Sequence, residues 1–259
     1  MFFFKKKTAA LLAASILLVS LAGCGEEEKE PYVSPDFKNE STNNTGYEPN
    51  IENASVTDAT YGDAELMYDA EPLDEEATEE LMASVTDAEA LEAGAYGDGI
   101  YYNTVAGFVI NVKDTNWAFY DAAGVANATG LTEEDVNNFW YGYKTTKDAE
   151  TSYCCIAYDK NTGSNIIVSY VNPSVTLFPE ITSDEYLEMA LGRYENLRVK
   201  RVKFMGELWS CLDIPADQNP AGRRVCYAKK SGDILVLVTF TMQDDQELSS
   251  AQGLFTRIR

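Results

Sequence analysis

The 259-residue chain contains no histidine, which removes the commonest general base, the usual serine-hydrolase triad and most zinc sites. Glycine-rich phosphate loops are also absent, and only 20 Lys and Arg stand against 42 Asp and Glu. The adjacent carboxylates Glu133–Glu134 and Asp244–Asp245 open predicted helices, where acidic residues are expected on dipole grounds alone. We therefore expect a protein that is not an enzyme, with no cofactor, no metal and no nucleic-acid partner.

The N-terminus has the order of a secretory signal. Lys5, Lys6 and Lys7 precede an unbroken run of apolar and small residues over 8–23. This run is shorter than the roughly 20 residues that a membrane-spanning helix needs. It is also followed by acidic residues rather than by a basic stop. The pattern predicts a signal peptide over 1–23.

The last residues of this segment, Leu21-Ala22-Gly23-Cys24, resemble the lipobox of bacterial lipoproteins. The resemblance implies that Cys24 becomes the new N-terminus and carries lipid, such as palmitate chains, on its sulfur. Two buried acyl chains give stable anchoring, so the mature protein would be held at the extracytoplasmic face of the cell membrane. The alternative is a plain signal peptide with an accidental cysteine nearby.

Residues 24–98 form a second region of distinct composition. After Cys24 they contain 22 Asp and Glu against two Lys, few large apolar residues and scattered prolines. Such a segment cannot bury enough apolar surface to offset the entropy of ordering, so we expect a disordered acidic stalk. The sequence ASVTDA occurs twice in it, at 54–59 and at 83–88, either as a repeated docking motif or as a duplicated piece of linker.

Residues 99–259 have the composition of a globular domain and contain all three Trp. Their periodicity predicts a mostly antiparallel sheet covered by helices, an α+β fold. The expected strands are a hairpin within 99–112, then 117–120, 152–158, 165–171, 199–205, 207–214, 223–229 and 234–241. The expected helices are 132–139, one that begins at Thr182 with a capping box to Glu185, and 244–258.

The order of these elements and the positions of Gly107-Phe108, Trp117-Ala118-Phe119-Tyr120 and Gly206-Glu207-Leu208-Trp209 resemble the PsbP-like lipoproteins of bacteria. The resemblance covers roughly 101–259. It implies an α/β/α sandwich, in which helices lie on both sides of an antiparallel sheet, and no shared catalytic residues. Known members of the family act as binding or accessory subunits.

Four cysteines remain in the predicted domain: Cys154, Cys155, Cys211 and Cys226. If Ile214 pairs with Arg223, Cys211 lies opposite Cys226 and the two are within disulfide range. A disulfide there and two buried thiols are both open interpretations. Adjacent residues of a strand point to opposite faces, so at least one of Cys154 and Cys155 is expected in the core.

Two groups of side chains are candidates for partner binding. Arg198, Lys200, Arg201 and Lys203 follow one predicted strand, with four more basic residues at 223, 224, 229 and 230. They could bind an anionic polymer or the stalk itself, or protect a strand edge. Aromatic residues of 139–143, with Tyr101, Tyr102 and Tyr120, could stack on sugars or fill a core.

We expect a lipid-anchored extracytoplasmic protein that binds an envelope protein or an anionic polymer without catalysis. One alternative is a cell-wall glycan-binding module, which an exposed aromatic cluster would favour. The other is a hydrolase-type enzyme that uses carboxylates, which requires a concave site where carboxylates converge.

Overall fold

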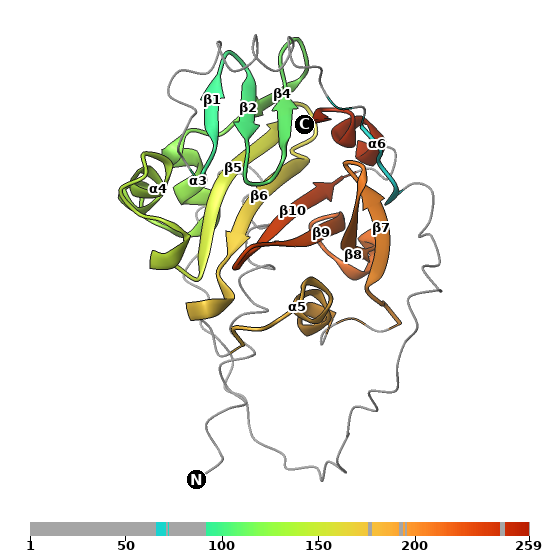
Figure 1. The fold of residues 1–259 in the computed structure, drawn as a ribbon. Helices are drawn as coiled ribbons and strands as arrows, with labels where there is room; N and C mark the ends of the chain where they lie inside the picture. The colour runs from blue at the N-terminus through green and yellow to red at the C-terminus, as the bar shows by residue number, and fades with distance from the viewer. Residues whose placement is uncertain are drawn as a thin grey trace, which may run out of the picture.

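The computed structural model describes residues 66–70, 72, 92–175, 178–191, 194, 196–243 and 247–258. Within these ranges the chain forms two antiparallel sheets and four α-helices, shown in Figure 1. Cys24, the signal peptide and both copies of the ASVTDA sequence lie outside the described residues.

The larger sheet has seven strands. Their order across the sheet is β4 (Trp117–Phe119), β5 (Thr151–Asp159), β6 (Asn165–Val171), β10 (Ile234–Met242), β9 (Arg223–Ser231), β8 (Glu207–Ile214) and β7 (Lys200–Phe204). All six neighbouring pairs are antiparallel, as the sequence predicted.

Tight turns set the register of two of its hairpins. Between β5 and β6, the Asp159 carboxylate accepts from the backbone N–H groups of Asn161 and Thr162. Between β7 and β8, Met205 and Gly206 both have positive φ, 55° and 74°, as a two-residue type I′ hairpin requires. The turn at 159–163 was predicted from its residues, whereas Met205 adopts a positive φ that is uncommon for residues other than glycine.

The smaller sheet has four strands, in the order β1 (Ala95–Gly97), β2 (Ile100–Asn103), β3 (Phe108–Asn111) and β11 (Phe255–Arg257). The hairpin expected within 99–112 is confirmed as β2 and β3. The helix expected over 244–258 is wrong in its second half. Helix α6 covers only Glu247–Gln252, and the chain then enters β11, which pairs with β3.

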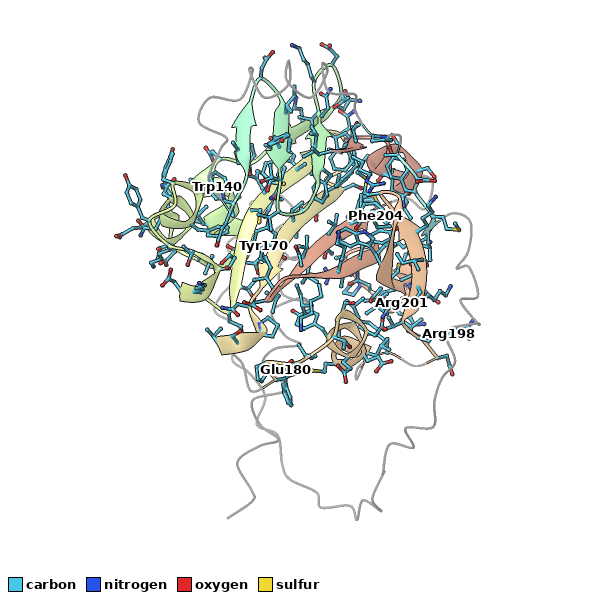
Figure 2. All side chains as sticks on the ribbon, viewed as in Figure 1. Trp140, Tyr170, Glu180, Arg198, Arg201 and Phe204 are labelled. Carbon is cyan, nitrogen blue, oxygen red and sulfur yellow. The ribbon has the colours of Figure 1, made fainter. Side chains whose placement is uncertain are left out.

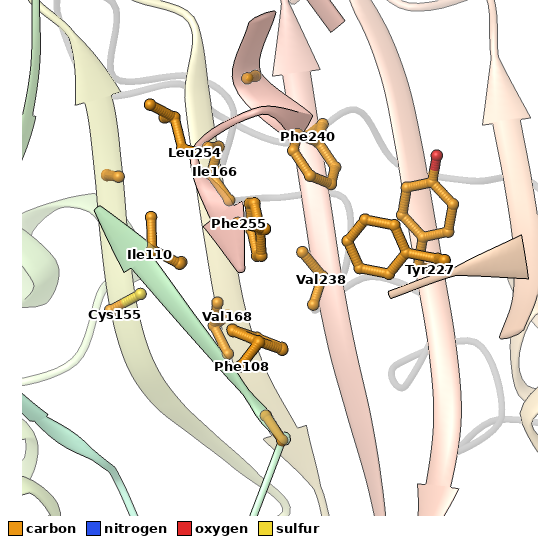
Figure 3. Close-up of a cluster of buried hydrophobic side chains, with 14 of the residues drawn as sticks. Phe108, Ile110, Cys155, Ile166, Val168, Tyr227, Val238, Phe240, Leu254 and Phe255 are labelled. Atoms are coloured by element: carbon orange, nitrogen blue, oxygen red, sulfur yellow. The ribbon is translucent and has the colours of Figure 1, made fainter. Parts of the chain in front are cut away.

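The main core lies between the two sheets, and Figure 3 shows its centre. Phe108 and Ile110 of β3 and Phe255 of β11 face side chains of β6, β9 and β10. The rings of Phe204 and Tyr227 stack at 4.2 Å, and Phe255 packs against Phe204 at 5.6 Å. The two sheets therefore share one continuous core.

Helices cover the other face of the large sheet. Helix α3 (Ala122–Thr129) and helix α4 (Glu133–Trp140) pack on Ile156 and Ile167, and α5 (Ser183–Ala190) packs at β8 and β9. The expected antiparallel sheet with helices is thus confirmed in outline. The face opposite these helices is covered by the second sheet and α6 rather than by a full layer of helices.

Three short 3₁₀-helices complete the described chain: Thr146–Asp148, Pro173–Val175 and Ala216–Gln218. Hydroxyl groups cap the helices where the sequence predicted. Thr132 caps α4, and Thr182 with Glu185 forms the expected capping box of α5. Helix α5 ends at Ala190, earlier than the apolar spacing through Leu197 suggested.

The folded part of the chain begins before Gly99, so the expected boundary there is wrong for the residues described. Leu66 is fully buried in the main core, and β1 adds a strand ahead of β2. Tyr68 and Pro72 form parallel bridges with Phe204 and Arg257. The sequence placed Leu66, Tyr68, Pro72 and β1 in the stalk because their surroundings are acidic and poor in apolar residues.

Candidate functional site

The four basic residues singled out in the sequence lie along or just before β7, the last strand of the large sheet. Arg198 and Arg201 are exposed, and Figure 2 shows both on the side of the molecule next to α5. Arg201 pairs with Asp184 in the first turn of α5, with Nε 3.0 Å from Oδ2. Lys203 pairs with Asp69. Arg201 and Lys203 thus form ion pairs with acidic residues of the same chain, whereas Lys200, the neighbour of Arg201 on β7, points to the opposite face of the sheet. We call Arg198, Lys200, Arg201 and Lys203 the basic edge.

Part of this edge is occupied by residues 66–70 of the acidic region. The Tyr68 N–H donates to the Lys203 carbonyl at 2.9 Å, and the Met205 N–H donates to the Tyr68 carbonyl at 2.7 Å. The Tyr227 hydroxyl donates to the Leu66 carbonyl at 2.9 Å. These contacts place residues 66–70, whose one carboxylate is Asp69, against the end of β7 by two main-chain hydrogen bonds and one ion pair. Of the interpretations of the basic residues, contact with the stalk itself is thus observed for Lys203.

Of the two interpretations of Cys211 and Cys226, the disulfide is wrong and the buried thiols are confirmed, because the register differs by one residue from the one considered. Ile214 pairs with Arg224, so Cys211 lies opposite Tyr227 and Leu212 lies opposite Cys226. A shift of one residue moves a side chain to the other face of a sheet. Cys211 accordingly belongs to the main core and Cys226 to the core beneath α5, and both thiols are free.

Cys154 and Cys155 are both buried in the main core, whereas regular alternation would place them on opposite faces. The register of β5 against β6 shifts between Tyr153 and Cys155, which is the sign of a β-bulge. Burial raises the pKa of all four described thiols, to about 11 for Cys226. These thiols are core residues and carry no nucleophilic chemistry at neutral pH.

The aromatic cluster proposed for glycan binding is split between core and surface. Tyr101, Tyr102 and Phe139 are buried, whereas the side chains of Tyr141 and Tyr143 are 65% and 81% exposed. Tyr141 borders a cleft of about 520 Å³ on the side of the molecule that carries Trp140 in Figure 2. We call this the aromatic cleft. Its lining includes Tyr96, Phe119, Tyr120, Trp140 and Tyr141, together with Asp98 and Asp121, whose carboxylates pair with Lys113 and cap α3, respectively.

Sequence reasoning missed a small cavity on the helix-covered face of the large sheet. Arg224 lines it and is only 2% exposed, and burial lowers the pKa of its guanidinium. The cavity holds about 20 Å³, enough for roughly one water. Its other lining residues come from β5, β6, β10 and α5, so no local spacing could have revealed them: Thr151, Tyr153, Ile167, Ser169, Val171, Tyr186, Leu237, Thr239 and Thr241.

Arg223 also lies inward rather than on a basic surface. Its side chain is largely buried and makes two hydrogen bonds of 3.0 Å to Asp213. Among the described residues, no cluster of three or more Asp, Glu or Cys is arranged to hold a metal ion. No helix in the described ranges is both long and apolar enough to cross a membrane.

No protein-family model matches this chain, and no curated protein matches it. The resemblance to PsbP-like lipoproteins therefore stays an interpretation that rests on the order of elements and a few aromatic positions.

Proposed function

We propose that the protein is a lipoprotein, anchored by lipid on Cys24 at the extracytoplasmic face of the cell membrane, whose domain binds another envelope component without catalysing a reaction. The order of lysines, apolar run and Leu-Ala-Gly-Cys at 21–24 supports the anchor. The PsbP-like order of elements supports an accessory or binding role.

The observation that carries the binding site is the contact between residues 66–70 and the basic edge. At this contact the end of β7 makes main-chain hydrogen bonds with Tyr68, and Lys203 pairs with the carboxylate of Asp69. Adding a strand to an exposed sheet edge is a common mode of peptide recognition. We propose that the partner presents a similar acidic segment to the part of the edge before Lys203, where Arg198 and Arg201 are exposed.

Two tests address the two halves of this proposal. For the anchor, the full chain expressed in bacteria is labelled with palmitate. We expect label in the membrane fraction and its loss in Cys24→Ser, and labelling that survives this change would contradict the anchor.

For the binding site, the full chain captures partners from solubilised envelope. The edge variant changes Arg198, Lys200 and Arg201 to Ser but keeps Lys203, which holds residues 66–70. The control changes the exposed Lys147, Lys160 and Lys230 to Ser, an equal loss of charge elsewhere. We expect an identified acidic partner to bind the parent and the control but not the edge variant. Equal recovery by all three would reject the basic edge.

The aromatic cleft supports a second candidate function, which is glycan binding. Aromatic faces suit the apolar faces of sugars, and about 520 Å³ lies within the usual range for ligand sites. Purified cell-wall polymer should then bind the parent, and Tyr141→Ala should weaken this binding. The control is Tyr143→Ala, which removes an exposed tyrosine that does not line the cleft. Polymer binding that is unaffected by Tyr141→Ala would remove this candidate.

A further inference from the structure

Besides the aromatic cleft, a cleft with charged lining residues lies where the two sheets meet. Its volume is about 350 Å³. The turn between β2 and β3 forms one wall, the start of β8 forms the other, and charged side chains of Glu207, Lys229 and Arg257 line it. Lys229 comes from β9 of the large sheet and Arg257 from β11 of the small sheet. The fold thus brings together two cations that lie far apart in the sequence.

The described lining residues of this cleft carry a net positive charge in a strongly acidic protein. Glu207 is the one carboxylate among them and pairs with Lys229. The second Glu207 oxygen lies 3.6 Å from Arg257 Nη2, which is longer than a charge-assisted hydrogen bond. The side chains of Lys229 and Arg257 are 27% and 37% exposed, so a ligand can reach them while water is partly excluded. One carboxylate against two cations leaves an excess that favours an anion.

A buried donor lies beside these charges. Trp209 lines the cleft and is 1% exposed, and its indole Nε1 has no hydrogen-bond partner among the residues described. Lys229 Nζ lies 5.4 Å from the centre of the Trp209 ring. Nε1 has almost no accessible surface, so the Trp209 ring forms part of the cleft wall while its N–H stays inside the protein. The apolar side chains of Met205 and Ile258 line the same cleft.

We propose that this cleft binds a small organic oxyanion, a carboxylate or phosphate with a short apolar body. Lys229 and Arg257 hold the anionic oxygens, and the apolar lining contacts the body of the ligand. The volume lies at the lower end of the range for small-molecule sites. This site is distinct from the basic edge, and it stands or falls independently of the proposed partner binding.

The test is a titration of the full chain in detergent, with the indole N–H resonance of Trp209 as the readout. Trp209→Phe assigns this resonance among the three tryptophans. The probes are phenyl phosphate and benzoate, with benzyl alcohol as a neutral control. We expect a saturable shift of the Trp209 signal with both anions and none with benzyl alcohol.

Matched variants localise the effect. Lys229→Met should weaken binding at least tenfold, and Lys229→Arg should restore most of it. Lys230→Met removes the next lysine of β9, which does not line the cleft, and should leave binding unchanged. The spectrum of each variant without probe shows that it is folded.

Two outcomes overturn the proposal: no saturable shift in the parent, or equal affinities in the parent and Lys229→Met. Glycerol phosphate in solution and vesicles of phosphatidylglycerol then identify the source of the anion. A response to the soluble phosphate indicates a metabolite, and a response to vesicles alone indicates a lipid headgroup.

Discussion

At the scale of single residues, burial determines the chemistry of the described cysteines. Cys154, Cys155, Cys211 and Cys226 are at most 1% exposed, and burial raises the pKa of each thiol. The thiolate is the reactive species, so these groups should resist modification in the folded protein. In Cys24→Ser, we expect a thiol reagent at pH 8 to modify less than one equivalent before unfolding and four in urea. A fast reaction of one or more thiols in the folded protein would contradict this assignment.

Glu185 is the residue whose titration should affect stability at acid pH. Its carboxylate accepts from the Thr182 backbone N–H at 2.8 Å and also bonds the Thr182 hydroxyl, and these bonds lower its pKa. A carboxylate with a lowered pKa stabilises the fold above its unfolded pKa of about 4.3, and this contribution disappears as the pH falls through the folded value.

Glu185→Gln should therefore unfold at lower urea concentration than the parent at pH 7, by about 0.5–1 kcal/mol. The difference should narrow as the pH falls below the unfolded pKa of about 4.3 and the parent is protonated. Glu188→Gln, on the same helix and outside the capping box, serves as the control. A difference that stays constant down to pH 3 would show that the charge of Glu185 is not involved.

At the scale of elements, a helix or strand could be predicted where the residues that determine it lie close together in the sequence. The strands of the large sheet were found because alternating apolar residues and turn residues such as those at 159–163 lie together in the sequence. Helix α3 was missed because its sequence AAGVANAT lacks a charged face. Leu248, Ala251 and Phe255 fit a helical period, yet Phe255 lies in a strand because β3 offers its edge.

The two groups of cations differ in whether the sequence could predict them. The basic edge was predictable because its residues follow one another along a single strand. The cleft at Lys229 and Arg257 depends on the packing of two sheets, and no spacing in the sequence encodes it. The register considered for β8 against β9 was wrong by one residue. The connection between these strands, over 215–222, is long and does not fix their alignment.

The segment at 66–70 gives an element-scale prediction. Leu66 is fully buried in the main core although it lies in an acidic region. Leu66→Ala should cost about 2–4 kcal/mol of unfolding free energy, because it removes a buried side chain and leaves a cavity. Leu131→Ala, at a position 39% exposed, should cost less than about 1 kcal/mol. Urea unfolding of the full chain measures both, and equal costs would show that residues 66–70 do not belong to the folded unit.

At the scale of the whole molecule, the two sheets should unfold together because they share one core. Phe255 of the small sheet packs within 5.6 Å of Phe204 and within 5.5 Å of Phe240, which belong to the large sheet. Each sheet therefore contributes side chains that the other needs in order to stay buried. Small domains with a single core usually unfold in one cooperative step.

Phe255→Ala tests this coupling. It should cost about 3–5 kcal/mol, the range for removing a buried phenylalanine. Protection of the amides against hydrogen exchange should fall equally in both sheets, because the cavity borders both. We would compare the exchange of the amides of β3 and β9 in the parent and in the variant. If β3 alone lost protection while β9 kept that of the parent, the small sheet would be a separate unit. The cleft lined by Lys229 and Arg257 would then lie between two parts that open independently.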